Sequence, residues 1–346
     1  MTVPVSEGLA SGISPPGATG TISPGGLRRI GSARWRRRNL TFDKISFFLV
    51  FLVIPVAFYI GFVVSPFVQA AYFSLTDWTG FTPAMNFVGL SNYGKLFTDS
   101  TFLQAMGNNI LMAIVVPIVT LGLAMFFATL VTVGGSTRGN VRGLRNSSFY
   151  RVISFFPYVI PAIVIGLIWS QIYDPSAGLL NGILTRLGLE QFTSFAWLGD
   201  PSTARWAVMF VIIWGLVGFY MVLFIAAIKG VPAEVFEAAR IDGAGRLRTS
   251  VSITIPLIRD NVQTAFIYIG ILALDAFVYM AALEPGGGPD NTTLVMAQQL
   301  FTTAFTKGQF GYACAMGVVL AVITLAYAGL VFAVSRFFGG KSEVGE

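Results

Sequence analysis

The chain contains no histidine and a single cysteine, Cys314, so several kinds of site lack the residues they need. Zinc sites built from Cys and His, haem ligation by His, Ser-His-Asp triads and structural disulfides within the chain are all excluded. These absences argue against a metal centre and against an intramembrane enzyme with an assembled catalytic set.

Charged residues are also scarce, at 11% of the chain, whereas 55% of the residues are hydrophobic. A soluble domain of this size rarely has that composition. A bilayer core about 30 Å thick needs roughly 20 apolar residues per helix. Six stretches qualify. They are continuously apolar and do not alternate between apolar and polar residues as barrel strands do, so they predict an all-α membrane protein. The predicted spans are residues 45–74, 106–133, 152–173, 206–227, 262–283 and 312–337.

The basic residues predict how these spans are oriented, because cytoplasmic segments carry an excess of Lys and Arg. With the N-terminus inside, the outer segments keep four of the 22 basic residues, which are Lys95, Arg186, Arg205 and Lys307. This bias predicts a multi-pass protein of the cytoplasmic membrane with both termini in the cytoplasm. The net charge of +6 then needs no nucleic acid as a partner, since the basic run before the first span can anchor to lipid headgroups.

Composition divides the chain into three parts. Residues 1–44 begin with a Gly-, Ser- and Pro-rich stretch and end in the basic run, which predicts a disordered cytoplasmic tail. Residues 45–338 form the predicted transmembrane domain, and residues 339–346 form a cytoplasmic C-terminal tail. No apolar h-region stands at the extreme N-terminus, so no cleavable signal peptide is predicted.

One short triplet imitates a nucleotide-binding motif. Gly340-Lys341-Ser342 has the form of the end of a P-loop, but Ser335 stands where that motif needs its first Gly. The chain is therefore not expected to hydrolyse ATP through this segment.

The most informative polar segment lies between the fourth and fifth predicted spans. It reads Glu237-Ala238-Ala239-Arg240-Ile241-Asp242-Gly243-Ala244, and continues to Ile253 and to Ile255-Pro256. This pattern resembles the EAA loop of permease subunits in binding-protein-dependent ABC importers. The alternative is an ordinary amphipathic cytosolic helix.

The EAA resemblance implies a docking site for an ATPase on a separate chain. Pro232 ends the incoming helix, Ala233 to Ala239 favour a short helix, and Gly243 is free to make a tight turn. The residues that match the family's coupling positions are Glu237, Ala238, Ala239, Asp242 and Gly243. The chain departs from the family at Ser250, where an aromatic is frequent, and at Asp260, where a second Pro is frequent.

Two outer segments carry the resemblance further, to importers of carbohydrates. The run from Phe73 to Trp78 and the run from Phe87 to Tyr93 are similar to the family's S-x-T-D-W and F-V-G-L-x-N-Y patterns, with Asp77 as a candidate cap of a short helix. Gly286-Gly287-Gly288-Pro289 resembles the G-G-G-P of one of two permease types that work as unlike pairs.

This family resemblance implies a set of partners and no cofactor of the chain's own. The implied partners are a second EAA-containing permease, two ATPase subunits that bind ATP, an extracellular solute-binding protein and a sugar. Gln298-Gln299-Leu300-Phe301 resembles permeases for N-acetylglucosamine or its disaccharide.

The third span contains Pro157 and Pro161, a pair that the family also carries. Proline within a helix removes a backbone hydrogen bond and bends the helix. The bend has two interpretations, a packing kink and a hinge for gating.

A polar stripe in the fifth span is the candidate substrate path. Asp275 is the one acid within a predicted span, and placing it there costs about 2.5–3.5 kcal/mol on insertion scales, so it should face protein or water. Asn261, Tyr268, Asp275 and Tyr279 follow a helical period and predict one face, with Trp214 and Tyr220 as further candidates from the fourth span. The alternative is a polar seam between helices.

An ion-coupled secondary transporter of a small polar solute is the alternative from another class. That class uses paired intramembrane charges or broken helices in both halves of the protein. Asp275 is the one acid in the spans, and the one base, Arg336, stands at the cytoplasmic end of the sixth span, so a proton or sodium coupling site inside the membrane has little support.

Overall fold

The computed structural model describes residues 46–132 and 147–338. These residues form helices and connecting loops, and one isolated antiparallel bridge joins Thr76 to Phe87. The elements in chain order are η1 (Leu49–Val53), α2 (Ile54–Tyr59), η2 (Ile60–Val64), α3 (Ser65–Phe73), α4 (Ser91–Leu96), α5 (Ser100–Thr132), α6 (Ser147–Val159), α7 (Ala162–Ile172), α8 (Leu179–Arg186), η3 (Glu190–Phe192), α9 (Ala204–Lys229), α10 (Ala233–Ile241), α11 (Arg246–Thr249), η4 (Ser250–Thr254), α12 (Ile255–Leu257), α13 (Arg259–Asp275), α14 (Phe277–Leu283), η5 (Pro289–Asn291), α15 (Met296–Phe301), η6 (Thr302–Thr306) and α16 (Phe310–Phe338).

The predicted all-α membrane fold is confirmed, while the number of spans stays a prediction. Four described helices are long and apolar enough to cross a membrane: Ser46–Phe73, Ser100–Thr132, Ala204–Lys229 and Phe310–Phe337. The number rises to six if each of two bent helix pairs is one span. The predicted tails, residues 1–44 and 339–346, both lie outside the described residues.

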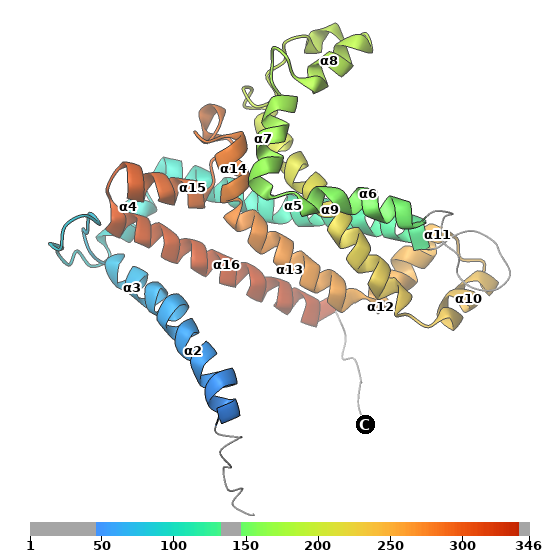
Figure 1. The fold of residues 1–346 in the computed structure, drawn as a ribbon, viewed down its shortest axis with the longest axis horizontal. Coiled ribbons are helices and arrows are strands. Elements are labelled where there is room, and N and C mark those ends of the chain that lie inside the picture. The colour runs from blue at the N-terminus through green and yellow to red at the C-terminus, as the bar shows by residue number, and fades with distance from the viewer. Residues whose placement is uncertain (1–45, 133–146, 339–346) are drawn as a thin grey trace, which may run out of the picture. The chain divides into compact units, whose positions relative to one another are not determined.

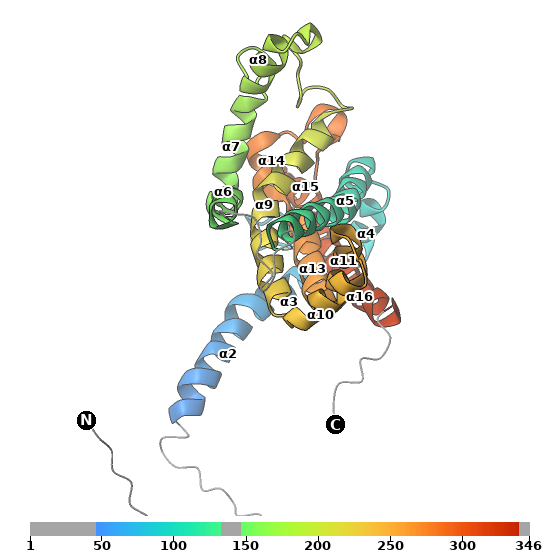
Figure 2. The same cartoon turned by 90° about the vertical axis from the view of Figure 1, so that its right-hand side faces the viewer.

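The chain divides into two units, Met1–Ala57 and Phe58–Glu346. The described part of the first unit is helical, and all of its side chains from Ser46 onward are exposed. In the second unit α5 packs against α9 and α13, and α13 packs against α16 (Figures 1 and 2).

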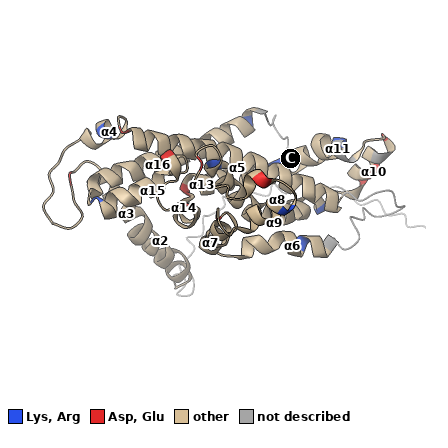
Figure 3. Ribbon diagram, turned by 90° about the horizontal axis from the view of Figure 1, so that it is seen from above, with Lys and Arg blue, Asp and Glu red and all other residues tan. Residues whose placement is uncertain are grey.

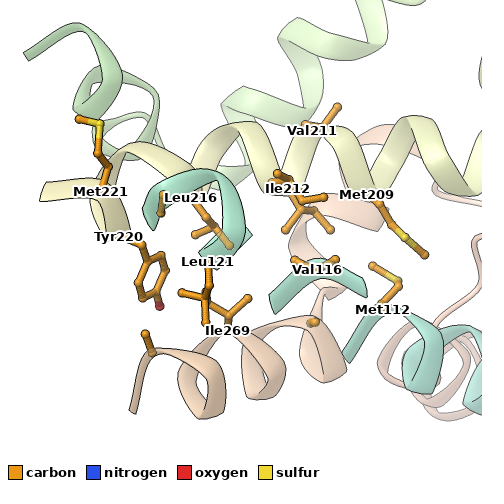
Figure 4. Close-up of a cluster of buried hydrophobic side chains, with 14 of the residues drawn as sticks. Met112, Val116, Leu121, Met209, Val211, Ile212, Leu216, Tyr220, Met221 and Ile269 are labelled. Carbon is orange, nitrogen blue, oxygen red and sulfur yellow. The ribbon is translucent and has the colours of Figure 1, made fainter. Parts of the chain in front are cut away.

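The main core of the second unit lies where α5, α9 and α13 meet. Met112 and Val116 of α5, Ile212 of α9 and Ile269 of α13 are almost fully buried in it, and Figure 4 shows their side chains converging. Lipid tails are as apolar as these side chains, so close packing rather than water exclusion holds such helices together in a bilayer.

A glycine allows the closest helix contact beside this core. At Gly218 of α9, a Cβ atom would overlap the backbone carbonyl of Ser154 on α6. Small residues let helix backbones approach within a membrane, and this contact fixes α6 against α9.

The third predicted span is bent far more sharply than an ordinary kink. Ser148–Val159 and Ala162–Ile172 meet at 97°, with Pro161 immediately before α7. The predicted bend is confirmed at Pro161, whereas Pro157 lies inside α6. α6 packs mainly on α9 and α7 packs mainly on α14, so the two halves of the bent span have different neighbours.

A bend precedes the predicted fifth span and a break interrupts it, and the sequence indicated neither. A bend of 79° separates Ser250–Leu257 from Arg259–Asp275. A second break follows Asp275, where Ala276 leaves helical geometry, so the predicted span 262–283 consists of α13 and the separate helix α14.

Charged residues are distributed as a membrane requires. Figure 3 shows ribbons that are largely tan, with Lys, Arg, Asp and Glu gathered near helix ends and on the short helices α10 and α11. This distribution leaves the long helices apolar and places the polar candidate surfaces where the chain can meet partners or water.

Candidate functional site

The segment with the EAA pattern folds as a short helix followed by a tight turn, as predicted. α10 begins after Pro232 and ends at Ile241, and Gly243 has φ +72°. The amide of Asp242 donates to the carbonyl of Ala238 at 3.0 Å, and the amide of Ala244 donates to Ala239 at 2.9 Å. The second bond spans five residues, which is the signature of a Schellman ending that needs a left-handed residue at the Gly243 position.

The two faces of α10 have different surroundings. Phe236 and Ala239 are each 5% exposed and turn towards the chain's own core. Glu237, Ala238 and Asp242 are exposed, and Ile241 is 86% exposed. We call the four exposed residues Glu237, Ala238, Ile241 and Asp242 the coupling surface. Ala239 belongs to the opposite face, so it can support a docking site but does not form part of its surface.

The coupling surface combines a carboxylate, a small side chain and an exposed apolar side chain. A carboxylate at such a place can accept charge-assisted hydrogen bonds, worth about 1.5–3 kcal/mol each. Ile241 adds an exposed apolar side chain next to this carboxylate. Ile241 was not among the residues chosen from the sequence, although it lies inside the recognised pattern.

A second feature is a groove of about 740 Å³ between α6, α9 and α13. We call it the polar groove, because hydroxyl, amide and carboxylate groups lie among its apolar walls. It is lined by Tyr158, Phe219, Tyr220, Leu223, Asp260, Asn261, Thr264, Ala265, Tyr268, Ile271, Leu272 and Asp275. None of these lining residues is Lys or Arg.

The structure brings four of the predicted path residues together in this groove. Asn261, Tyr268 and Asp275 lie along one face of α13, and Tyr220 faces them from α9. Asp275 is exposed at the last turn of α13, and Tyr268 is 65% exposed. The predicted stripe therefore exists as far as Asp275.

The other two predicted path residues, Tyr279 and Trp214, do not line the polar groove. Tyr279 lies beyond the break at Ala276, on α14, where it is 7% exposed and its hydroxyl packs beside Gly215. Trp214 contacts Trp169, with 5.4 Å between ring centroids, and lines a separate apolar groove of about 560 Å³ between α5, α6 and α9. The prediction of one continuous face through Tyr279 is wrong, because the helix ends four residues earlier.

Two aromatic residues of the polar groove were missed from the sequence. Tyr158 of α6 stacks on Phe219 of α9, with centroids 4.3 Å apart. Tyr158 directly follows Pro157 and Phe219 directly precedes Tyr220, so the available signal was their adjacency to residues already selected. Asp260 and Thr264 were missed as lining residues as well, although they share the period of the α13 stripe.

A buried amide on α5 supports the break that ends this stripe. Asn109 is 0% exposed, and its Nδ2 donates to the carbonyls of Ala273 at 3.2 Å and Leu274 at 2.8 Å. Its Oδ1 accepts from the amide of Met296 at 2.7 Å. A helix that ends within a membrane leaves carbonyls unpaired, and Asn109 satisfies two of them. Asn109 thereby holds the end of α13, where Asp275 lies.

The loop that follows α14 is held by side chains of α5 and α9. Gly287 and Gly288 have φ values of +88° and +72°, which glycine adopts readily. Asn108 donates to the carbonyls of Asn291 and Leu294, both at 2.9 Å. The side chains of Gln104 and Arg205 donate to other carbonyls of the same loop. The Gly-Gly-Gly-Pro segment is therefore an anchored turn.

Carboxyl groups in the loops differ in their surroundings. Asp77 accepts from the backbone amide of Asn86 at 2.6 Å and from its side chain at 2.9 Å, and these bonds lower the pKa of Asp77. Asp77 therefore joins two parts of one loop, and the predicted helix cap is wrong. Burial raises the pKa of Glu284, at the end of α14, to about 7.

Comparison with known families identifies the class of protein. Residues 131–339 match the family described as "Binding-protein-dependent transport system inner membrane component". The chain belongs to this family. The predicted importer permease is thus confirmed, and the chain is a membrane-embedded transport component.

Similar proteins agree with this assignment. The chain is 63% identical to a diacetylchitobiose uptake system permease protein of Streptomyces coelicolor, over 89% of this chain and 87% of that protein. It is 32% identical to a multiple sugar-binding transport system permease protein of Streptococcus mutans, over 79% of this chain and 89% of that protein.

A solved structure supports the fold of this permease. A bacterial ABC transporter involved in the import of the acidic polysaccharide alginate contains a chain that matches with a TM-score of 0.71. The match covers 86% of this chain and 98% of that chain at 19% identity, so it supports the fold alone.

Proposed function

We propose that the chain is one permease subunit of a sugar importer and that its polar groove forms one wall of the sugar path. The observation that carries this proposal is the composition of the groove, which places carboxylate, amide and phenol groups beside stacked aromatic rings. Carboxylates and amides bind sugar hydroxyls, and aromatic rings cover the apolar faces of pyranoses. The relatives named above are permeases for sugars.

The substrate class that we propose is an N-acetylated disaccharide of the chitobiose kind. The diacetylchitobiose permease is 63% identical over most of both chains, which is the support for this choice. The groove agrees with a neutral solute, since its walls carry no basic side chain that would recognise an anionic sugar.

The groove needs a partner to become an enclosed path. Tyr268 and Asp275 are exposed on the side of α13 that lines it, and an acid in a membrane span should face protein or water. We infer that a second, unlike permease supplies the opposite wall. An extracellular solute-binding protein then delivers the sugar, as the periplasmic protein in the alginate system suggests.

Energy comes from ATPase subunits that dock on the coupling surface. The chain holds no complete P-loop, and the coupling surface offers Glu237 and Ile241 to a partner. The excess of basic residues in the segments predicted to be inner supports a cytoplasmic position for α10 and for both termini. Residues 1–44 would then be a cytoplasmic tail that contacts lipid headgroups.

Reconstitution tests this proposal against the secondary-transporter alternative. The permease would be placed in proteoliposomes with the second permease, the ATPases and the binding protein, and uptake of labelled N,N′-diacetylchitobiose would be measured. We expect uptake that requires ATP and persists when proton and sodium gradients are collapsed. Uptake driven by an ion gradient without ATP would refute the importer mechanism, and ATP-driven uptake of another sugar alone would refute the substrate.

A further inference from the structure

A π-helical turn connects the coupling surface to the helix bundle. η4 (Ser250–Thr254) is a π-helix that follows directly on α11 and leads through α12 to the 79° bend before α13. Three other described segments, η1, η2 and η6, are also π-helical, so η4 matters here for its position and not for its type. This turn lies between the coupling surface and the helix that carries most of the polar groove.

The first residue of the π-helix makes a side-chain hydrogen bond to α5. Ser250 Oγ lies 3.0 Å from Thr129 Oγ1, and each residue is 7% exposed. Thr129 donates its single hydroxyl proton to the carbonyl of Met125 at 2.8 Å, so Ser250 must be the donor to Thr129. Because a buried hydroxyl without a partner is costly, this bond favours one position of η4 on α5.

Hydrogen bonds within the segment make it behave as one piece. Thr254 donates to the carbonyl of Thr249 at 3.1 Å, and Thr249 donates to the carbonyl of Gly245 at 3.0 Å. Phe236 of α10 and Ile258 at the bend are both buried in the main core. These bonds tie together the backbone between Gly245 and Thr254, and Ser250 bonds this segment to α5.

We propose that the Ser250–Thr129 hydrogen bond is a latch that transfers movement of the coupling surface to α5. The latch rests on the proposed function, because it assumes that an ATPase moves α10. α5 packs against both α9 and α13, which carry two walls of the polar groove. Ser250 and Thr129 are thus positioning residues, and they link ATP hydrolysis to rearrangement of the groove without touching the sugar.

The test compares variants that remove the latch from either side. Ser250→Ala removes the donor of the bond. Thr129→Val removes the acceptor while the side chain keeps nearly the same shape, and Ser250→Thr keeps a hydroxyl at position 250. Thr324→Val is a matched control, because Thr324 on α16 likewise donates to the carbonyl four residues earlier but bonds to no second helix. All variants would be assembled as the full transporter in proteoliposomes with N,N′-diacetylchitobiose.

The readout is the amount of sugar moved per ATP hydrolysed. We expect Ser250→Ala and Thr129→Val each to lower this ratio about fivefold. That is the change in an equilibrium constant expected when one ordinary hydrogen bond is lost. The double variant should be no worse than either single variant, since both remove the same bond. Ser250→Thr and Thr324→Val should keep the wild-type ratio. An unchanged ratio in both single variants, or losses that multiply in the double variant, would overturn the latch.

A second readout does not depend on the identity of the sugar. Tyr268→Cys in a Cys314→Ala background places a thiol in the polar groove, and its labelling rate is measured with and without ATP. We expect ATP to change the rate in the parent protein and to change it much less with Ser250→Ala. An equal response in both proteins refutes the latch even if another sugar is transported, whereas no response in the parent refutes the proposal that ATP changes the polar groove.

Discussion

Tyr158 of α6 and Phe219 of α9 stack with their ring centroids 4.3 Å apart and 19° between the ring planes. Both rings line the polar groove, and Phe219 also meets Tyr220 edge to face at 5.0 Å. The close contact of Gly218 with α6 brings these rings together, because a larger residue there would separate the two helices. A fixed aromatic surface therefore lies opposite the polar stripe of α13.

This aromatic pair predicts how transport responds to loss of a ring. Tyr158→Ala and Phe219→Ala should each reduce uptake at limiting sugar about 2- to 10-fold, the range expected when one aromatic contact is lost. Tyr158→Phe should keep most of the uptake, since the ring remains. Phe126→Ala is the control, because Phe126 pairs with Phe127 on α5 and lies outside the groove. Equal uptake by all four variants would show that the stack has no role in sugar passage.

The turn after α10 allows a comparison of two glycines that differ in backbone conformation. A Cβ atom added at Gly243 or at Gly245 would meet no other atom within 4 Å. The two differ in backbone conformation, because Gly243 has a left-handed φ of +72°, whereas the φ of Gly245 lies outside the left-handed region. Gly243→Ala should therefore destabilise the turn by about 1 kcal/mol and weaken ATPase attachment, whereas Gly245→Ala should be tolerated.

Co-purification of the ATPase with each tagged permease variant checks this difference. Gly243→Pro, which cannot adopt a positive φ, should remove attachment while the chain still inserts. Ile241→Asp should weaken attachment without changing the turn, since its side chain is 86% exposed. Normal attachment of both Gly243→Pro and Ile241→Asp would show that the ATPase docks elsewhere.

Local signals explain which parts were predictable from the sequence. Pro232 and Gly243 fix the two ends of α10 by rules that act within a few residues, so the helix and its turn were found. The period of Asn261, Tyr268 and Asp275 was also correct, because it depends on helix geometry alone.

The errors arose where distant residues decide the backbone. The break at Ala276 is supported by Asn109, which lies on another helix, so the sequence around Tyr279 gave no warning. The adjacent amides Asn108 and Asn109 in an apolar span were the available signal, because polar groups within a membrane usually have a partner. The stacking of Tyr158 on Phe219 likewise depends on how α6 packs against α9.

Thiol labelling checks the predicted orientation. In a Cys314→Ala background, Asn140→Cys should react with an impermeant reagent only after the cells are permeabilised, whereas Glu190→Cys should react in intact cells. The reason is the excess of basic residues around the first of these positions. The reverse pattern would place α10 outside the cell and contradict the coupling proposal.

Glu284 predicts a pH dependence of stability. Its pKa is raised by burial from 4.5 to about 7, so the folded protein holds this proton at pH values where the unfolded chain has released it. Stability from this group should be complete below pH 4.5 and fall as the pH rises to about 7. Glu284→Gln should remove that fall and raise the melting temperature above pH 7 relative to the parent protein. Identical pH profiles for the two proteins would contradict the raised pKa of the partly buried Glu284.

Asp275 gives the most direct test of the sugar path. It is exposed at the end of α13, lines the polar groove, and has no Lys or Arg among the groove's lining residues. Its carboxylate therefore depends on water, on sugar hydroxyls or on the second permease for compensation. Asp275→Asn keeps the shape and one acceptor, so uptake of N,N′-diacetylchitobiose should fall moderately, about 3- to 10-fold for a weakened charged hydrogen bond. Asp275→Leu should reduce uptake further.

The measurement is uptake into vesicles with matched amounts of assembled transporter. Glu190→Gln serves as the control, because Glu190 is an exposed acid in η3, away from the groove. Both Asp275 variants should still co-purify with the ATPase, since the coupling surface is unchanged. If Asp275→Leu transports as the parent does, Asp275 neither binds the sugar nor shapes its path, and the stripe on α13 is a polar seam against the second permease.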